Sequence, residues 1–393
     1  MFWSASSGGV RRYLLAKQAW LERRGGWRHT IAAPVCDNPD MARVPAIPLP
    51  GSGGYRLPLD RGACTKVLTG LQFDIIEAGD PYRLAWSALD ASQALSAPAV
   101  AFAHSNLEAM ARRACGHLGE RLSSAAARAA GKYVLHLYGQ YDLVLAPSHA
   151  MRNHLLALGL RNVERQPLGV DSTLFNPALH DPAWRRELRA SLELAPGTHL
   201  LLYVGRFAPE KNLQVLTDAV ARLGKGYALL AVGAGPTPPR GDHVRVRPYE
   251  ADRGRLARLL ANVDALVHAG DQETFGLAVL EAMASGTPVI ARASDGLAEL
   301  VDEEVGAGVP SLQPDAFAEA IAAVCQSDGE RSASRALAAR RRARKYDWER
   351  VFPQLFSRYA ALMHGPDAAQ TIDPGLDSVD LDSQWPQSQT SLA

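Results

Sequence analysis

The chain has 393 residues, more than one hydrophobic core of ordinary size holds, and this length predicts two domains. Apolar residues make up 47% of the sequence and charged residues 21%, and both values are typical of a globular protein. The formal net charge of +1 excludes a global field that would attract nucleic acid, so any selectivity for anions must come from local groups.

In chain order, short apolar runs alternate with amphipathic segments of helical length, which predicts βαβ units and parallel sheets. Only Met1-Phe2-Trp3 precede the first turn, so either the first strand is short or the chain starts downstream of its natural beginning. Near-continuous apolar runs predict strands that are buried on both faces. The predicted strands are Thr30–Ala33, Phe73–Glu77, Ala99–Ala103 and Asp142–Ala146 in the first half, and Leu200–Val204, Ala228–Val232, Val244–Val246, Ala265–His268 and Pro288–Ala291 in the second.

The change between the halves is expected at 169–177, where the letters GVDSTLFNP have the composition of a linker. We therefore predict one domain over 1–172 and a second over 173–345. A last helical pattern spans Trp348–Met363. After it, 364–393 has acidic residues among Gly, Ser, Gln and Pro but no Lys or Arg, and this composition predicts a disordered acidic tail.

The first helical pattern is basic and amphipathic. Such a helix can lie on anionic lipid, so weak peripheral membrane contact is one expectation, and a domain helix with one solvated face is the other. No run of about 18 apolar residues predicts a membrane span, and no signal-peptide pattern is present. The expected location is the cytoplasm or the inner membrane face. The basic residues are Arg11, Arg12, Lys17, Arg23 and Arg24.

The strongest local signal is the segment ETFGLAVLEAMASGTP, which starts at Glu273 after an apolar strand. A helix is predicted to open near Gly276, so Glu273 falls in the loop at the strand's carboxyl end and Glu281 on the helix. Free N–H groups of Phe275, Gly276 and Leu277 at the helix start favour a phosphate. Glu281, deeper in the helix, can accept two hydrogen bonds from a ribose diol. The alternative is that both glutamates are solvated helix-face residues.

A second signal, GRFAPEKN, begins at Gly205 and also lies between a buried strand and a helix. Arg206 and Lys211 stand five residues apart across the turn, so both side chains can converge on one anion. A diphosphate leaving group needs such positive charge as its bond to a sugar breaks. The alternative is that both are surface cations.

Two glycine turns carry weaker signals. Gly8 and Gly9 precede the first helix, where glycine permits close approach of a ligand and the helix start favours an anion, and a plain βα turn is the alternative. Gly233-Ala-Gly235 resembles half of a dinucleotide fingerprint, but the third glycine is absent because Pro238 stands in its place. We interpret this turn as facing a ligand other than NAD.

His104 follows a predicted strand directly and would face the space between the two halves, where it could bind a sugar hydroxyl or orient an acceptor. A satisfied structural histidine is the alternative. No Walker A loop, G-x-S-x-G or H-E-x-x-H motif occurs. The D-x-D at Asp380 and Asp382 lies in the acidic tail, so no metal site is expected.

At these residues the chain resembles the large retaining family of GT-B glycosyltransferases, which includes bacterial mannosyltransferases, sucrose-phosphate synthases and glycogen-synthase-type enzymes. The resemblance covers roughly residues 1–363 and implies an α/β fold of two Rossmann-like parallel-sheet domains that face each other across a cleft. It also implies that the last helix, over 346–363, crosses back to the first domain. The residues that carry it are Gly8-Gly9, Pro147-Ser148, Gly169 to Pro177, Gly205-Arg206, Lys211-Asn212, Glu273 to Glu281, Gly286-Thr-Pro288, and Gly296 with Glu299.

The resemblance implies an enzyme that moves a hexose, mannose or glucose first, from a nucleotide-diphosphate sugar to an acceptor hydroxyl on a glycan, lipid or small molecule. The anomeric configuration would be kept by same-face attack, in which the leaving phosphate deprotonates the acceptor. No cofactor or metal is expected, because cationic side chains would compensate the charge of the leaving group. GDP-mannose and UDP-linked hexoses are the expected donors.

For the site, the resemblance implies that Glu281 holds the ribose and that Glu273 lies near the transferred sugar. Arg206 and Lys211 would hold the diphosphate, and Gly9 would approach it from the first domain. The predicted catalytic residues are Glu273, His104, Arg206 and Lys211, and the predicted donor-binding residues are Gly9, Arg206, Lys211, Glu273, Phe275, Gly276, Leu277 and Glu281.

Three alternatives stay open at this point. A nicotinamide-dependent dehydrogenase shares the doubly wound pattern, but the broken glycine fingerprint argues against it. A non-catalytic or truncated relative that binds nucleotide or glycan would fit the short first strand. An epimerase or phosphorylase could share the architecture, although no setting for a pyridoxal-binding lysine is apparent.

Overall fold

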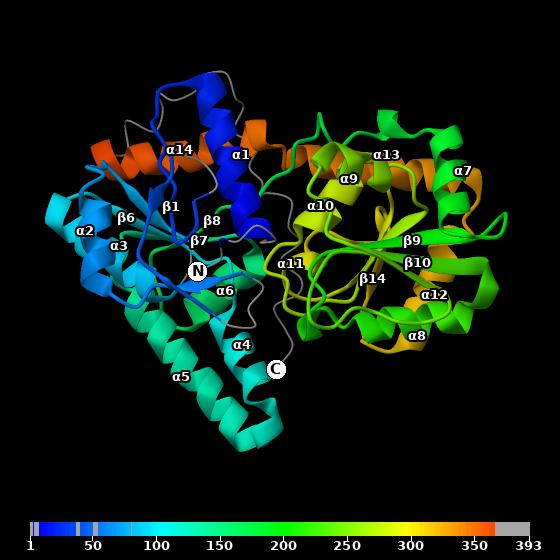
Figure 1. Ribbon diagram of the computed structural model, residues 1–393, viewed down its shortest axis with the longest axis horizontal. Coiled ribbons are helices and arrows are strands. Elements are labelled where there is room, and N and C mark those ends of the chain that lie inside the picture. The colour runs from blue at the N-terminus through cyan, green and yellow to red at the C-terminus, as the bar shows by residue number, and fades with distance from the viewer. Residues whose placement is uncertain (1–2, 4–7, 37–39, 50–53, 80, 366–393) are drawn as a thin grey trace.

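The computed structural model describes residues 3, 8–36, 40–49, 54–79 and 81–365, which form two α/β domains (Figure 1). The first domain is built around a four-stranded parallel sheet in the order β5-β6-β7-β8. Its strands are β5 (Ile76–Ala78), β6 (Ala99–Phe102), β7 (Leu143–Ala146) and β8 (Val163–Arg165). Two short ladders lie apart from this sheet, the parallel pair β1 (Ala32–Ala33) and β2 (Ala42–Arg43) and the antiparallel pair β3 (Ile47–Pro48) and β4 (Arg56–Leu57).

Helices surround the first sheet, and three of them begin at a residue whose side chain accepts a backbone N–H bond of the first turn. These residues are Asp60, Asn106 and Ser148, so the starts of the helices after them are encoded locally. The helices described in this domain are α1 (Gly9–Arg24), α2 (Arg61–Thr69), α3 (Arg83–Leu95), α4 (Leu107–Ala114), α5 (Glu120–Tyr138) and α6 (His149–Ala157).

The second domain holds a six-stranded parallel sheet in the order β11-β10-β9-β12-β13-β14. Its strands are β9 (His199–Val204), β10 (Tyr227–Val232), β11 (Val244–Arg247), β12 (Ala265–His268), β13 (Val289–Arg292) and β14 (Gly306–Val309). The helices are α7 (Pro182–Ser191), α8 (Leu213–Leu223), α9 (Arg253–Leu260), α10 (Leu277–Ala284), α11 (Asp295–Ala298), α12 (Pro314–Cys325) and α13 (Gly329–Lys345). This order, with its reversal at β9, is that of a doubly wound sheet.

The position of strand β9 in the sheet explains why its sequence is apolar without interruption. Leu200 and Leu202 belong to one buried cluster, whereas Leu201 and Tyr203 belong to another. Alternate side chains of a strand point to opposite faces, so the two clusters are the cores on the two sides of the sheet. Because helices cover both faces, every residue of the run must be apolar.

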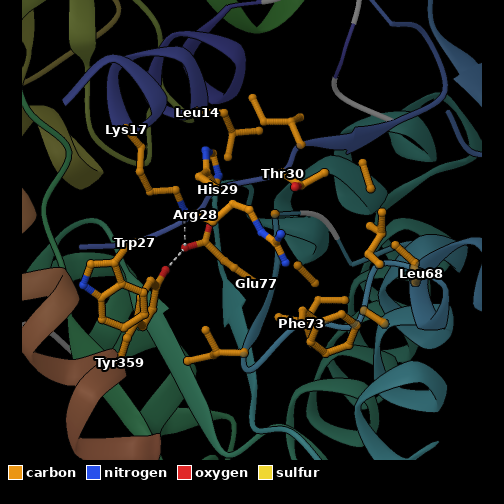
Figure 2. Close-up of a pocket in the computed structure, with 18 of the residues that line it drawn as sticks. Leu14, Lys17, Trp27, Arg28, His29, Thr30, Leu68, Phe73, Glu77 and Tyr359 are labelled. Atoms are coloured by element: carbon orange, nitrogen blue, oxygen red, sulfur yellow. Dashed lines mark hydrogen bonds and ion pairs between the residues drawn. The ribbon is translucent and has the colours of Figure 1, made fainter. Parts of the chain in front are cut away.

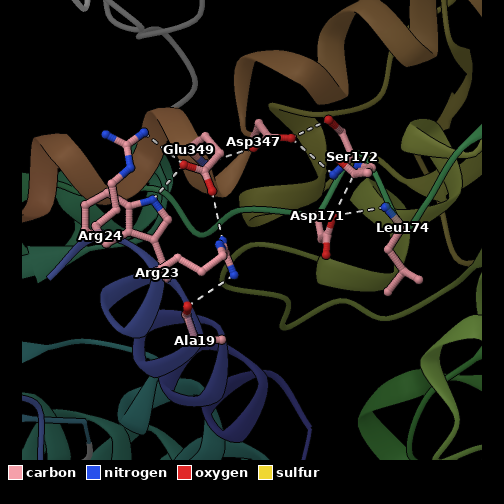
Figure 3. Close-up of polar contacts among 10 residues, drawn as sticks. Ala19, Arg23, Arg24, Asp171, Ser172, Leu174, Asp347 and Glu349 are labelled. Carbon is pink, nitrogen blue, oxygen red and sulfur yellow. Dashed lines mark hydrogen bonds and ion pairs between the residues drawn. The ribbon is translucent and has the colours of Figure 1, made fainter.

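Helix α14 (Trp348–His364) follows α13 and packs on α1 of the first domain (Figure 3). Just before its first turn, Asp347 accepts from the Ser172 backbone N–H at 3.1 Å, which holds the interdomain linker. Glu349 accepts from Trp20 Nε1 at 2.9 Å, and the Trp20 ring stacks on Phe356 with centroids 5.4 Å apart. Polar and aromatic contacts therefore fix α14 to the first domain and to the interdomain linker.

Helix α1 buries one side, with Tyr13, Trp20 and Leu21, and leaves Arg23 and Arg24 exposed, so the expected domain helix is found, although its basic residues do not all lie on the exposed side. Lys17 is 3% exposed and lies inside the first domain. The others contact partners in α14, the second domain or a ring, because α1 lies between these parts of the molecule. No helix in the described residues is long and apolar enough to cross a membrane. The contacts are those of Arg11 with the Trp3 ring, Arg12 with Glu281, Lys17 with Glu77, and Arg23 and Arg24 with Glu349.

The expected fold class, with two parallel-sheet domains and a returning helix, is confirmed. Strands β8 and β14 were not predicted, because the charged letters VER and the glycines of GAGV hide their pattern. The strand expected at Thr30–Ala33 is reduced to Ala32–Ala33 and does not join the four-stranded sheet. The predictions for Met1-Phe2 and for the acidic tail from 366 onward, with its D-x-D, lie outside the described residues.

Candidate active site

Lys211 and Glu273 meet at the carboxyl ends of β9 and β12, the adjacent central strands of the second sheet. Lys211 ends a short 3-10 helix (Pro209–Lys211), and its Nζ donates to Glu273 Oε1. The two side chains are 16% and 17% exposed, so the ion pair is largely shielded from water. The edge of the sheet where it lies is the place where open α/β sheets bind ligands.

His268 is a third member of this cluster. It is the last residue of β12, is 4% exposed, and its Nε2 lies 3.3 Å from the same Oε1 of Glu273. Its Nδ1 accepts from the Gly270 backbone N–H at 3.1 Å, which leaves the Nε2–H to donate to Glu273. His268 is not among the predicted site residues, although its position at the end of a predicted strand was an available signal.

The Glu273 carboxylate is stabilised in its charged form. Burial alone would raise its pKa, but the Lys211 ammonium and the His268 ring together lower the pKa of Glu273 well below its ordinary value. The cluster therefore places a fixed negative charge beside a fixed positive one.

Arg206 lies on the same loop as Lys211 but has a different partner. It pairs with Glu210 and remains 55% exposed, so the expected convergence of Arg206 and Lys211 on one point is not found in this arrangement. The reason is that each cation has a carboxylate within reach of its own position. Tyr203 donates from its hydroxyl to the Arg206 backbone oxygen at 2.9 Å, and burial, followed by the charges of Glu273 and Glu210, raises the pKa of Tyr203 well above its ordinary value.

The start of α10 has the rigid backbone expected of an anion site. Gly276 has φ 103°, and a Cβ there would lie 2.5 Å from Leu297 Cδ2, so only glycine fits. Phe275 is 2% exposed and packs edge-on against Tyr346. The first N–H groups of α10, including that of Leu277, have no partner within the helix by its geometry. Phe275 and Gly276 thus hold these donors in place.

Gly9 of the first domain lies close to Leu277 of the second domain. A Cβ built on Gly9 would stand 3.3 Å from Leu277 Cδ1, and these two residues are the first residues of α1 and α10. The N-termini of two helices therefore lie close together where the two domains meet, and both helix dipoles favour an anion there.

Glu281 is bound by Arg12, a contact that was not predicted from the sequence. Arg12 Nη1 lies 3.0 Å from Glu281 Oε1 and 2.8 Å from Oε2, which joins α1 to α10. The Glu281 side chain is 4% exposed, so the alternative of a solvated helix-face residue is wrong. The carboxylate raises the pKa of Arg12 against the opposing effect of burial. In this structure both oxygens of Glu281 are bound by arginine and not open to a diol.

His104 lies where the two domains touch. Its backbone oxygen accepts from Thr274 Oγ1 at 2.9 Å, which links the end of β6 to the loop that carries Glu273. The ring stacks on Phe102 with centroids 4.2 Å apart. The structure thus brings His104 next to the β12–α10 loop, and Thr274 is a second residue that the sequence analysis missed.

The glycine turn after β10 has a structural explanation. A Cβ on Gly233 would stand 1.9 Å from the Gly205 oxygen, and one on Gly235 would stand 2.2 Å from the Phe207 oxygen. The Phe207 N–H also donates to Ala234 at 2.8 Å. Glycine is required here because the turn packs against the Arg206 loop, and this contact supports the position of that loop.

Comparisons with known proteins agree with this architecture. Residues 198–327 match the family described as Glycosyl transferases group 1, and residues 7–174 match Glycosyltransferase Family 4. A GDP-mannose-dependent alpha-(1-6)-phosphatidylinositol dimannoside mannosyltransferase of Mycobacterium tuberculosis is 31% identical over 345 residues, which cover 84% of each chain. A GDP-mannose-dependent alpha-mannosyltransferase of Mycolicibacterium smegmatis is 32% identical over 338 residues, again 84% of each chain.

Solved structures show the same fold. HepE of Anabaena, in complex with UDP and glucose, superposes with a TM-score of 0.70 at 19% identity and covers 91% of this chain and 98% of its own. Sucrose-phosphate synthase from Thermosynechococcus elongatus gives 0.69 at 22% identity, with 91% and 94% covered. These matches decide against the dehydrogenase alternative. The chain belongs to the GT-B glycosyltransferases, and it is a hexosyltransferase that uses a nucleotide-sugar donor.

Proposed function

We propose that this enzyme transfers mannose from GDP-mannose to a hydroxyl of a glycan or lipid-linked acceptor, with retention of the anomeric configuration. The relatives that are 31% and 32% identical over 84% of the chain are GDP-mannose-dependent, which favours this donor. The observation that carries the proposal is the meeting of the starts of α1 and α10 beside the Lys211–Glu273 pair. This arrangement suits a diphosphate with a sugar attached to it.

In this proposal the diphosphate lies against the first N–H groups of α10, at Leu277, and near Gly9. Lys211 and Arg206 supply positive charge as the sugar–oxygen bond breaks, and Arg206 is exposed enough to turn toward the anion. Glu273 lies near the transferred sugar and His104 faces it from the first domain. No cofactor or metal takes part.

Retention follows from same-face attack. The acceptor hydroxyl gives its proton to the leaving phosphate oxygen, a new bond forms to the anomeric carbon, and the bond to the diphosphate breaks on the same face. The protein then needs no nucleophile, and its contribution is to position both substrates and to stabilise the leaving charge.

Glu281 binds the ribose diol in the proposed complex, so donor binding must separate Glu281 from Arg12. The Arg12 side chain is 20% exposed, so it can move toward the cleft. Once released, its guanidinium is a cation from the first domain that the diphosphate can recruit.

Calorimetry with GDP, UDP and ADP tests the donor, on the wild-type chain and on Glu281→Ala. We expect GDP to bind and the variant to lose most of that affinity. Exclusive binding of UDP would overturn the choice of base, and binding of none by the folded protein would overturn the donor site. Proton NMR of the product formed with GDP-mannose and an alkyl mannoside then reports the anomeric configuration, and an inverted product would contradict retention.

A further inference from the structure

Two hollows of the described chain differ in the chemistry of their walls. The larger one, about 570 Å³ inside the first domain, has mainly apolar walls in which Lys17 and Tyr359 both bind Glu77 (Figure 2). All but two of the residues that line the smaller one have polar side chains. Its volume of about 460 Å³ lies in the range of roughly 300–1,000 Å³ that small-molecule sites occupy. Of the two, the smaller hollow therefore suits a polar ligand.

This hollow, which we call the α4–α6 hollow, lies where α4, α5 and α6 of the first domain meet the loop that carries Glu273 in the second. Asn106 stands two residues after His104, and Gln272 stands directly before Glu273. Because the proposed function places the transferred sugar between Glu273 and His104, a molecule in the hollow is next to that sugar. The polar residues of the lining are Asn106, Glu108, Arg112, Arg113, His154 and Gln272.

Glu108 of α4 is held in place by two other helices. Its Oε2 lies 2.6 Å from Nε2 of His154 on α6. A Cβ on Gly131 of α5 would stand 2.5 Å from Glu108 Oε1, so the carboxylate lies directly on the backbone of that helix. The Glu108 side chain is 19% exposed and lines the hollow, so a bound molecule meets a hydrogen-bond acceptor whose position is set by three helices.

Two side-chain amides complement this acceptor. Asn106 Oδ1 accepts from the Ala109 backbone N–H at 3.0 Å, which leaves the NH₂ group of Asn106 to donate. Gln272, in the orientation that satisfies its amide, accepts from Arg113 Nε at 2.9 Å and likewise keeps its NH₂ group as a donor. Sugar hydroxyls both donate and accept, so a carboxylate and two amides can bind neighbouring hydroxyls of one ring.

The charges around the hollow favour a neutral molecule. Arg112 binds Glu120 at 3.0 Å and Arg113 binds Asp271 at 2.7 Å, so each guanidinium already has a carboxylate partner. The Glu108 carboxylate would repel a phosphate or a carboxylate, because like charges that face each other are unfavourable. An acyl chain would leave the polar groups of the hollow unpaired, which is unfavourable as well. A neutral sugar satisfies both conditions.

We propose that Glu108, positioned by His154, selects a neutral hexose unit of the acceptor glycan and rejects an anionic one. The hydroxyls of this sugar donate to the Glu108 carboxylate and accept from the amides of Asn106 and Gln272. His154 acts through Glu108, since it fixes the carboxylate that the sugar meets. The role of this sugar as an acceptor rests on the proposed function, whereas its binding in the hollow does not depend on the donor.

Glu108→Gln tests this selection, because glutamine keeps the size of the side chain and removes its charge. Glu187→Gln, at an exposed carboxylate of α7, is the matched control. Initial rates with GDP-mannose compare two neutral acceptors, methyl α-mannoside and methyl α-glucoside, with mannose 6-phosphate and glucose 6-phosphate. The wild type and the control should prefer a methyl glycoside by about tenfold or more in kcat/KM. Glu108→Gln should reduce this preference by about tenfold or more, mainly through KM.

Saturation-transfer NMR of the same four sugars, recorded without a donor, measures binding alone. A methyl glycoside should bind to the wild type and to Glu187→Gln, and its signal should be lost in Glu108→Gln. The affinity for GDP, measured by calorimetry, should be the same in all three proteins, because Glu108 does not belong to the donor site.

An unchanged acceptor preference in folded Glu108→Gln, a wild-type preference for the sugar phosphates, or no binding of either methyl glycoside to the wild type would overturn the proposal. If Glu108→Gln does not fold, Gln272→Ala takes its place and should weaken binding of the methyl glycoside by about fivefold or more. Unchanged binding in that variant would also overturn the proposal. If a methyl glycoside binds as expected and GDP does not bind, the proposed donor is wrong and the sugar site in the hollow stands.

Discussion

Replacement of Lys211 with Met is expected to lower both stability and transfer activity. The Lys211 and Glu273 side chains are 16% and 17% exposed, so the variant would leave a largely buried carboxylate with His268 as its neighbour. Breaking a buried pair by removing one partner destabilises by about 3–5 kcal/mol, and the remaining His268 contact should limit the loss of stability to about 2–3 kcal/mol. Loss of the cation from the leaving group should lower kcat by roughly 100-fold or more.

The contribution of Glu273 to the free energy of unfolding depends on pH, and the direction of that dependence can be predicted. Burial raises the pKa of Glu273, but Lys211 and His268 lower it to well below the ordinary value of about 4.3. A lowered carboxyl pKa contributes stability at pH values above the unfolded pKa, and this stability is lost as the pH falls toward the folded pKa. The unfolding free energy of the wild type should therefore fall on acidification below about pH 5, and that of Lys211→Met should fall less steeply.

Urea unfolding at several pH values and initial rates with GDP-mannose measure these effects. Lys225→Met is the matched control, because Lys225 is an exposed lysine of the same domain. It should leave stability within about 0.5 kcal/mol and the rates unchanged. The reasoning is refuted if Lys211→Met keeps wild-type rates, or if its stability has the same pH profile as the wild type.

Three further predictions concern contacts between the domains and the start of α10. Arg12→Met should lower the free energy of unfolding by about 2–4 kcal/mol, because it leaves the buried Glu281 carboxylate without its cation. Adding Glu281→Gln should recover part of this loss in thermal melts. If Arg12→Met alone melts like the wild type, the prediction is contradicted. Gly276→Ala should lower the free energy of unfolding by about 2–4 kcal/mol, because alanine disfavours the positive φ and its Cβ would press on Leu297. The variant should also bind GDP more weakly in calorimetry. An unchanged melting temperature would refute the requirement for glycine. Thr274→Val should remove about 1 kcal/mol by deleting the bond to the first domain, as urea unfolding would show, and a loss above about 3 kcal/mol would point to a different role.

Part of the site could be predicted because it is encoded by short-range patterns. Glu273 and Lys211 each follow an apolar strand, and parallel strands end at one edge of a sheet, so the two residues come together. His268 was not predicted as a site residue, because a single histidine at the end of a buried strand forms no motif of recognisable spacing with other residues. Arg12 escaped because its partner Glu281 is 269 residues away in the chain, where no periodicity connects them.

The amino-acid sequence by itself determined the two-domain α/β class, the buried strands and the chemical character of the loops, because apolar runs, glycines and charges act within a few residues of their own position. Only the tertiary structure decided which carboxylate pairs with which cation and which strand edges find a partner. Glu281 faces Arg12 and β1 stays apart from β5 because of how helices and domains pack. Such contacts join residues far apart in the chain, and their energies depend on burial and distance in space.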